Sequence, residues 1–142
     1  MHDGDLATVN QPIDVLGVNY YSTATVRLWD GVSEKQQNDG HKGTAGGTAW
    51  PGSDQLVEFV EQPGPYTAMG WNIAPEGLEE LLVSLSEQFP TQPLMVTENG
   101  AAFDDEVAAD GSVPDPERTD YLRRHFTACL LYTSDAADEG LG

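Results

Sequence analysis

The chain has 142 residues, enough for one ordinary domain but fewer than the roughly 250 of a complete eight-stranded α/β barrel. Its 24 Asp and Glu residues outweigh six Lys and Arg, and the net charge of -18 argues against nucleic acid or an anionic membrane surface as a partner. No apolar run approaches the roughly 20 residues that cross a bilayer, and no Cys/His cluster has metal-ligand spacing. The single cysteine, Cys129, is expected to be a buried apolar residue.

Residues 13–22 form the first predicted strand. They are rich in β-branched and aromatic side chains of both parities, which is typical of a parallel strand covered on both faces. Because side chains alternate along a strand, Gly17, Asn19 and Tyr21 share one face. Two polar groups therefore gather at the C-terminal end of this strand.

Residues 29–62 are polar and rich in glycine, and we interpret them as one long loop. Two interpretations stay open. The loop is either a flexible insertion without chemistry or a segment that shapes the mouth of a substrate pocket.

A helix is predicted from Pro75, which suits the first helical position, to about residue 89. Its leucines recur at helical spacing and define one buried face: Leu78, Leu81, Leu82 and Leu85. A short apolar strand follows at residues 94–97 and runs into Glu98, with a sharp turn at Asn99 and Gly100.

A second helix is predicted after Asp115, which can cap it, with Pro116 at its first position. We expect its inner stripe to hold Tyr121, Leu122, His125, Phe126 and Cys129. The alternation of strands and helices predicts a parallel sheet with helical crossovers. In a closed α/β barrel the functional groups lie at the C-terminal strand ends, where Asn19, Tyr21 and Glu98 are found.

Residues 97–100, Thr-Glu-Asn-Gly after an apolar strand, resemble the nucleophile motif of family 1 glycoside hydrolases, which are eight-stranded α/β barrels. Three further blocks occur in the family's order: residues 16–21, residues 69–71 leading into 75–78, and residues 115–118 leading into 121–122. The resemblance covers about residues 5–127. It implies a partial (β/α)8 TIM barrel, about strands 6 and 7 with their helices, and places residues 1–129 in one barrel domain.

The resemblance also implies roles for four residues. Glu98 would be the nucleophile that attacks the anomeric carbon, and Tyr21 would orient it through a charge-assisted hydrogen bond. Trp71 would form a wall of the leaving-group site, and Asn19 would lie beside the bound sugar. From the residues alone, Tyr21 could instead be a core tyrosine and Trp71 a staple of its loop, while Asn99 is interpreted as shaping the turn.

The implied activity is that of a retaining β-glucosidase, which releases terminal β-D-glucosyl residues from β-glucosides or cello-oligosaccharides through a covalent glycosyl-enzyme intermediate. Side activity on β-galactosides or β-fucosides is compatible with the resemblance. No cofactor or metal is expected, because two carboxyl groups suffice.

The second carboxyl group is expected outside this chain. In the family the acid/base glutamate lies in an Asn-Glu-Pro block on the fourth strand, and the 142 residues contain no such block. We therefore expect the isolated chain to be inactive. The alternative is a truncated or degenerate barrel that binds carbohydrate or has no independent function.

The two ends of the sequence each lead to a prediction. Residues 130–142 match nothing that the family has at this place, and we interpret them as a tail that is not native to the gene. The first residues have neither a basic start nor an apolar stretch, which favours a cytoplasmic protein. The oligomeric state is not predicted.

Overall fold

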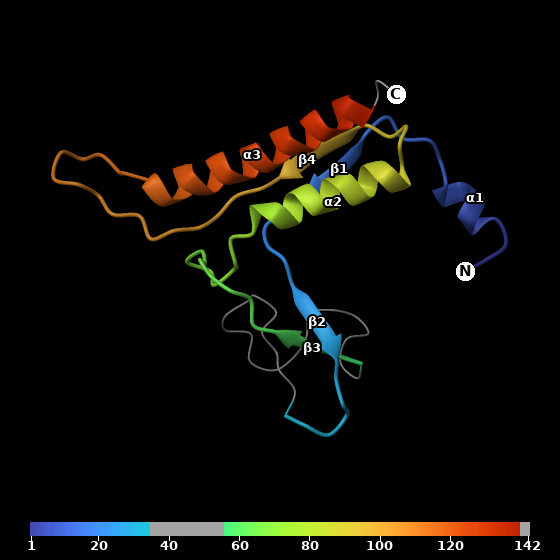
Figure 1. The fold of residues 1–142 in the computed structure, drawn as a ribbon, viewed down its shortest axis with the longest axis horizontal. Helices are drawn as coiled ribbons and strands as arrows, with labels where there is room; N and C mark the ends of the chain where they lie inside the picture. The colour runs from blue at the N-terminus through green and yellow to red at the C-terminus, as the bar shows by residue number, and fades with distance from the viewer. Residues whose placement is uncertain (35–55, 140–142) are drawn as a thin grey trace.

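The computed structural model describes residues 1–34 and 56–139. Its elements are α1 (Asp5–Val9), β1 (Leu16–Asn19), β2 (Thr25–Leu28), β3 (Val57–Val60), α2 (Pro75–Gln88), β4 (Leu94–Glu98) and α3 (Pro116–Glu139). In Figure 1, α2 and α3 lie along the β1–β4 sheet, while β2 and β3 extend away from it. The predicted order of strands and helices around the candidate motif is therefore confirmed.

β1 and β4 form a two-stranded parallel sheet, as predicted. Leu16 pairs with Leu94, and the register continues regularly to Val18 opposite Val96. It then shifts by one residue, so that Asn19 pairs with Glu98. Such a shift is typical of a β-bulge, which re-aims the side chains beyond it.

The core lies between this sheet and the two helices. Val18 and Tyr20 from β1 and its end pack with Leu78 and Leu82 from α2. Partly buried neighbours complete the layer: Leu81, Leu85, Leu94, Val96, Cys129 and Tyr132. The predicted leucine face of α2 is confirmed, and Cys129 is half-buried at the margin of this core.

The prediction that β1 is covered on both faces is wrong within the described ranges. Val18 is buried, whereas Gly17 and Asn19 on the opposite face are exposed. Met95 on β4 is likewise 54% exposed. The reason is that α2 and α3 cover one face of the sheet and no described element covers the other.

The interpretation of residues 29–62 as one loop is wrong in part. Residues 57–60 form β3, which pairs antiparallel with β2 along Thr25–Leu28. Phe59 is 3% exposed, and Glu58, also buried, forms an ion pair with Arg27 across the hairpin. Residues 35–55 lie outside the described part of the chain.

α3 begins as predicted, because the Asp115 carboxylate accepts a hydrogen bond from the Arg118 backbone N–H at 3.2 Å. The predicted stripe needs one correction. Tyr121 and His125 are buried, but Phe126 is 60% exposed and Ala128 is buried instead. Two residues five positions apart on a helix point in directions that differ by about 140°, so Phe126 cannot share the face of Tyr121.

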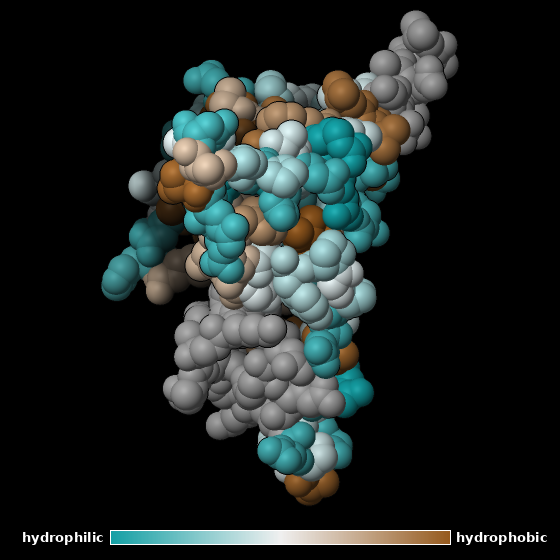
Figure 2. All heavy atoms as spheres, turned by 90° about the vertical axis from the view of Figure 1, so that its left-hand side faces the viewer, coloured by the Kyte–Doolittle hydropathy of each residue, from teal (hydrophilic) through white to brown (hydrophobic). Residues whose placement is uncertain are grey.

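α3 continues without a break to Glu139. The interpretation of residues 130–142 as a non-native tail stays a prediction. No helix in the described ranges combines the length and apolar character of a membrane span. On the face shown in Figure 2, the hydrophobic residues of the described part are interspersed with hydrophilic ones.

Candidate active site

Tyr21 and Glu98 meet where β1 and β4 end. The Tyr21 hydroxyl donates a hydrogen bond of 2.7 Å to the Oε2 atom of Glu98. The register shift makes this contact possible. Strict alternation after Leu94 and Val96 would direct Glu98 toward the helices, whereas its side chain is exposed on the side of Asn19 and Tyr21.

The contact also changes the acidity of the phenol. The hydrogen bond to Glu98 raises the pKa of Tyr21 above its ordinary value, with smaller contributions from desolvation and from the negative charge of Glu98. Tyr21 therefore keeps its proton and acts as the donor in this pair.

Trp71 lies against the same tyrosine. The two rings meet edge to face, with centroids 5.5 Å apart and planes inclined by 67°. Trp71 sits on a tight turn in which its carbonyl accepts from the Thr67 N–H at 2.8 Å and its N–H donates to Thr67 Oγ1 at 3.3 Å. Gly70 takes the left-handed conformation that this turn requires, with φ of 78°.

Asn19 occupies the exposed face beside this pair. Its Oδ1 accepts a hydrogen bond of 2.7 Å from the Thr97 hydroxyl, and its backbone lies opposite Glu98 in the ladder. The structure thus brings three of the four predicted site residues into one contact series, Trp71–Tyr21–Glu98, with Asn19 adjacent through β4. The roles given to these residues stay predictions.

Two residues next to this series were not predicted as part of the site. Asn99 was interpreted as a turn residue, yet its side-chain amide donates to the Tyr20 carbonyl at 2.9 Å and to the Tyr121 hydroxyl at 3.1 Å. Tyr121 was predicted only as a core residue of α3. The available signals were a polar residue inside the nucleophile motif, directly after Glu98, and a tyrosine on the inner stripe of the second predicted helix.

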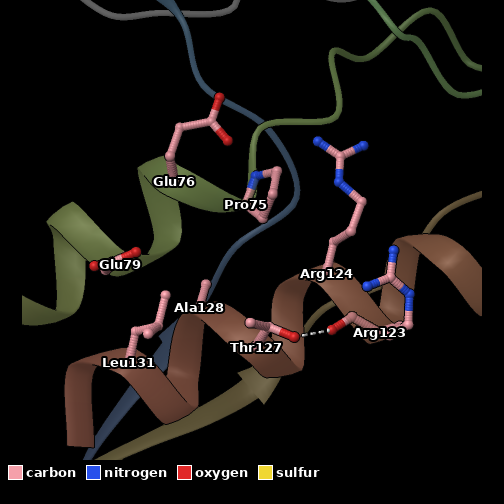
Figure 3. Close-up of a pocket in the computed structure, with 8 residues that line it drawn as sticks. All are labelled: Pro75, Glu76, Glu79, Arg123, Arg124, Thr127, Ala128 and Leu131. Carbon is pink, nitrogen blue, oxygen red and sulfur yellow. Dashed lines mark hydrogen bonds between the residues drawn. The ribbon is translucent and has the colours of Figure 1, made fainter. Parts of the chain in front are cut away.

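A groove of about 250 Å³ lies elsewhere, between the start of α2 and the middle of α3. Figure 3 shows its lining: Pro75, Glu76, Glu79, Arg123, Arg124, Thr127, Ala128 and Leu131. It contains none of the predicted site residues, so we place the candidate site at the strand ends and not in this groove. Across residues 1–34 and 56–139, no three His, Cys, Asp or Glu side chains are grouped as metal ligands would be.

The chain resembles known proteins over most of its length. The model of glycosyl hydrolase family 1 matches residues 1–139. The bifunctional beta-D-glucosidase/beta-D-fucosidase of Bifidobacterium breve is 46% identical over 140 residues, which is 96% of this chain and 29% of that protein. The 1,4-beta-D-glucan glucohydrolase of Thermotoga neapolitana is 40% identical over 125 residues, or 88% of this chain and 24% of the relative.

A solved structure agrees with these sequences. The beta-glucosidase from Thermotoga maritima in complex with noeuromycin has a TM-score of 0.70 and 34% identity, and the match covers 92% of this chain and 25% of that one. The described fold is therefore part of an α/β barrel. The chain spans about a quarter of the length of the proteins it matches.

Proposed function

This chain belongs to glycosyl hydrolase family 1, and from that membership we propose that it is the nucleophile-bearing part of a retaining β-glucosidase. Its relatives include β-glucosidases, so the family supports glycoside hydrolysis. We assign β1 and β4 to strands 6 and 7 of the barrel. The remaining strands, and the second carboxyl group that a retaining enzyme needs, would come from outside the 142 residues.

The observation that carries the proposal is the 2.7 Å hydrogen bond from Tyr21 to Glu98 at the carboxyl ends of two parallel barrel strands. It holds Oε2 of the carboxylate. Within the described residues Oε1 has no hydrogen-bond partner, which suits the oxygen that attacks. A neutral phenol that donates to a carboxylate orients it without removing its negative charge.

In the proposed reaction Oε1 of Glu98 forms a bond to the anomeric carbon while the bond from that carbon to the leaving oxygen breaks. An acid/base group of the complete barrel would protonate the leaving oxygen. Water, deprotonated by the same group, would then attack the anomeric carbon and release Glu98. Two displacements at one carbon retain the β configuration.

The surrounding residues suit a sugar site. Trp71 would present its flat indole to the leaving-group side, where it already packs against Tyr21. Asn19 would lie beside the sugar in the first subsite. The proposed substrates are β-glucosides and cello-oligosaccharides, and the name of the Bifidobacterium breve relative adds β-fucosides as a second class to be tested.

Glu98→Ala in the complete enzyme that carries this segment tests the proposal. We expect turnover of an activated aryl β-glucoside to fall at least about a thousandfold, because the attacking group is gone. Azide, which is small enough to occupy the vacated space, should restore turnover and yield the α-glucosyl azide. Glu106→Ala, which removes an exposed acid of the loop after β4, is the matched control and should leave turnover unchanged.

A Glu98→Ala enzyme that turned over normally would exclude Glu98 as the nucleophile. A β-configured azide product would also contradict the proposal, because azide that takes the place of Glu98 attacks from the α face.

A further inference from the structure

Asn99 connects three elements through one amide group. Its Nδ2 atom donates one hydrogen to the Tyr20 carbonyl at the end of β1 and the other to the Tyr121 hydroxyl on α3. The Tyr20 carbonyl can only accept, which fixes the amide orientation. A residue that only shaped the turn after Glu98 would not need both donors in these directions.

Tyr121 passes the connection on to Tyr21. Its hydroxyl, which accepts from Asn99, donates to the Tyr21 carbonyl at 3.3 Å. The Tyr121 ring is 1% exposed and stacks on His125 with centroids 3.9 Å apart. The hydroxyl is therefore held by a ring that cannot easily move.

These contacts close a ring around the nucleophile. It runs from Glu98 to Asn99 through the peptide bond, to Tyr121 and Tyr21 through hydrogen bonds, and back through the Tyr21 hydroxyl to the Glu98 carboxylate. We infer that Asn99 and Tyr121 are positioning residues that set Tyr21 against Glu98. The inference rests on the proposed role of Glu98 as the nucleophile.

The ring matters because it adds side-chain contacts to the backbone pairing at the two strand ends. Beyond the register shift, Asn19 pairs with Glu98, and the Tyr20 N–H donates a hydrogen bond of 2.9 Å to the Glu98 carbonyl. Within the described chain the Glu98 side chain is exposed and is held by the hydrogen bond from Tyr21. Loss of the ring should widen the range of carboxylate positions, which lowers kcat more than it changes KM.

Tyr121→Phe in the complete enzyme removes the hydroxyl and keeps the stacked ring. With an aryl β-glucoside we expect kcat to fall about threefold to tenfold, the effect of one neutral hydrogen bond, with KM within about twofold. Tyr20→Phe is the matched control. It also removes a buried tyrosine hydroxyl, one that donates to the Ala74 carbonyl outside the ring, so it should lower stability comparably and leave kcat unchanged.

Asn99→Asp provides the second variant and decides the matter if Tyr121→Phe does not fold. It keeps the shape of the side chain but turns an acceptor toward the Tyr20 carbonyl, and we expect kcat to fall at least about tenfold. Unchanged kcat in the folded Tyr121→Phe and Asn99→Asp enzymes, or an equal loss in Tyr20→Phe, would overturn the inference.

The Glu98→Ala experiment distinguishes a failure of the positioning inference from a failure of the proposed function. If Glu98→Ala abolishes turnover while the ring variants retain it, only the positioning inference fails. If Glu98→Ala retains turnover, the proposed function itself fails.

Discussion

His125 is 1% exposed and lies between two tyrosines, stacked on Tyr121 and 5.9 Å from the ring of Tyr20. Its Nδ1 is 2.8 Å from the Tyr121 carbonyl, which can only accept, so Nδ1 carries the proton. Within the described residues Nε2 is buried without a hydrogen-bond partner. The neutral imidazole is therefore the form that this site accommodates.

Burial lowers the pKa of His125, and the nearby positive charge of Arg124 acts in the same direction. The Tyr121 carbonyl and Glu76 oppose the shift only in part. As pH falls below the ordinary histidine pKa of about 6.5, the unfolded chain binds a proton that the folded chain resists, so stability falls by at most about 1.4 kcal/mol per pH unit. We expect NMR titration of the folded chain to place the His125 midpoint below about 6.5, with the signal assigned by His125→Phe. A midpoint at or above that value would contradict the geometry.

The sequence predicted which site residues would meet better than it predicted how. Side-chain alternation placed Asn19 and Tyr21 on one face, and the motif singled out Glu98. Alternation alone would have turned Glu98 toward the core, and only the register shift opposite Asn19 brings it to Tyr21. A bulge depends on pairing between segments about 80 residues apart, which local sequence does not encode.

At the level of elements, α2 was predictable because its signals are local. Pro75 at the first position and leucines at helical spacing are read within one segment. The β2–β3 hairpin was not predictable in this way, because each strand has only four residues and a long polar stretch separates the two strands. Phe59 on β3 is buried only after that distant pairing forms.

Gly77 in the first turn of α2 gives a prediction at this scale. A Cβ atom there would lie 2.5 Å from the Tyr20 hydroxyl and even closer to the Thr23 methyl group. Tyr20 cannot withdraw easily, since it is 6% exposed and bonded to Ala74. We expect Gly77→Ala to lower the free energy of unfolding by about 1–2 kcal/mol, because overpacking outweighs the gain in helix propensity.

Urea unfolding followed by circular dichroism measures this loss. Gly100→Ala is the control, because a Cβ atom there meets nothing within 4 Å, and it should change stability by less than about 0.5 kcal/mol. Equal stabilities for the two variants would show that α2 does not approach β1 as closely as described.

At the scale of the whole molecule, helices cover one face of the β1–β4 sheet, and the other face is exposed in the described chain. α2 and α3 bury Val18 and partly bury Val96, while Gly17 and Met95 on the other side of the sheet are exposed. In a barrel that second side is the interior, which is filled by side chains of the other strands. The chain spans about a quarter of the length of its relatives, and the other barrel strands that would cover this side are not among its described elements.

The same asymmetry predicts how the isolated chain behaves toward substrate. A retaining hydrolysis needs two carboxyl groups about 5–5.5 Å apart in a site that excludes water, whereas Glu98 is exposed and the Asn-Glu-Pro block is not in the sequence. We therefore expect the 142-residue chain to hydrolyse an aryl β-glucoside no faster than a Glu98→Gln variant of the same chain. Turnover near that of an intact β-glucosidase, lost on Glu98→Gln, would mean that a carboxyl group within this chain completes the pair.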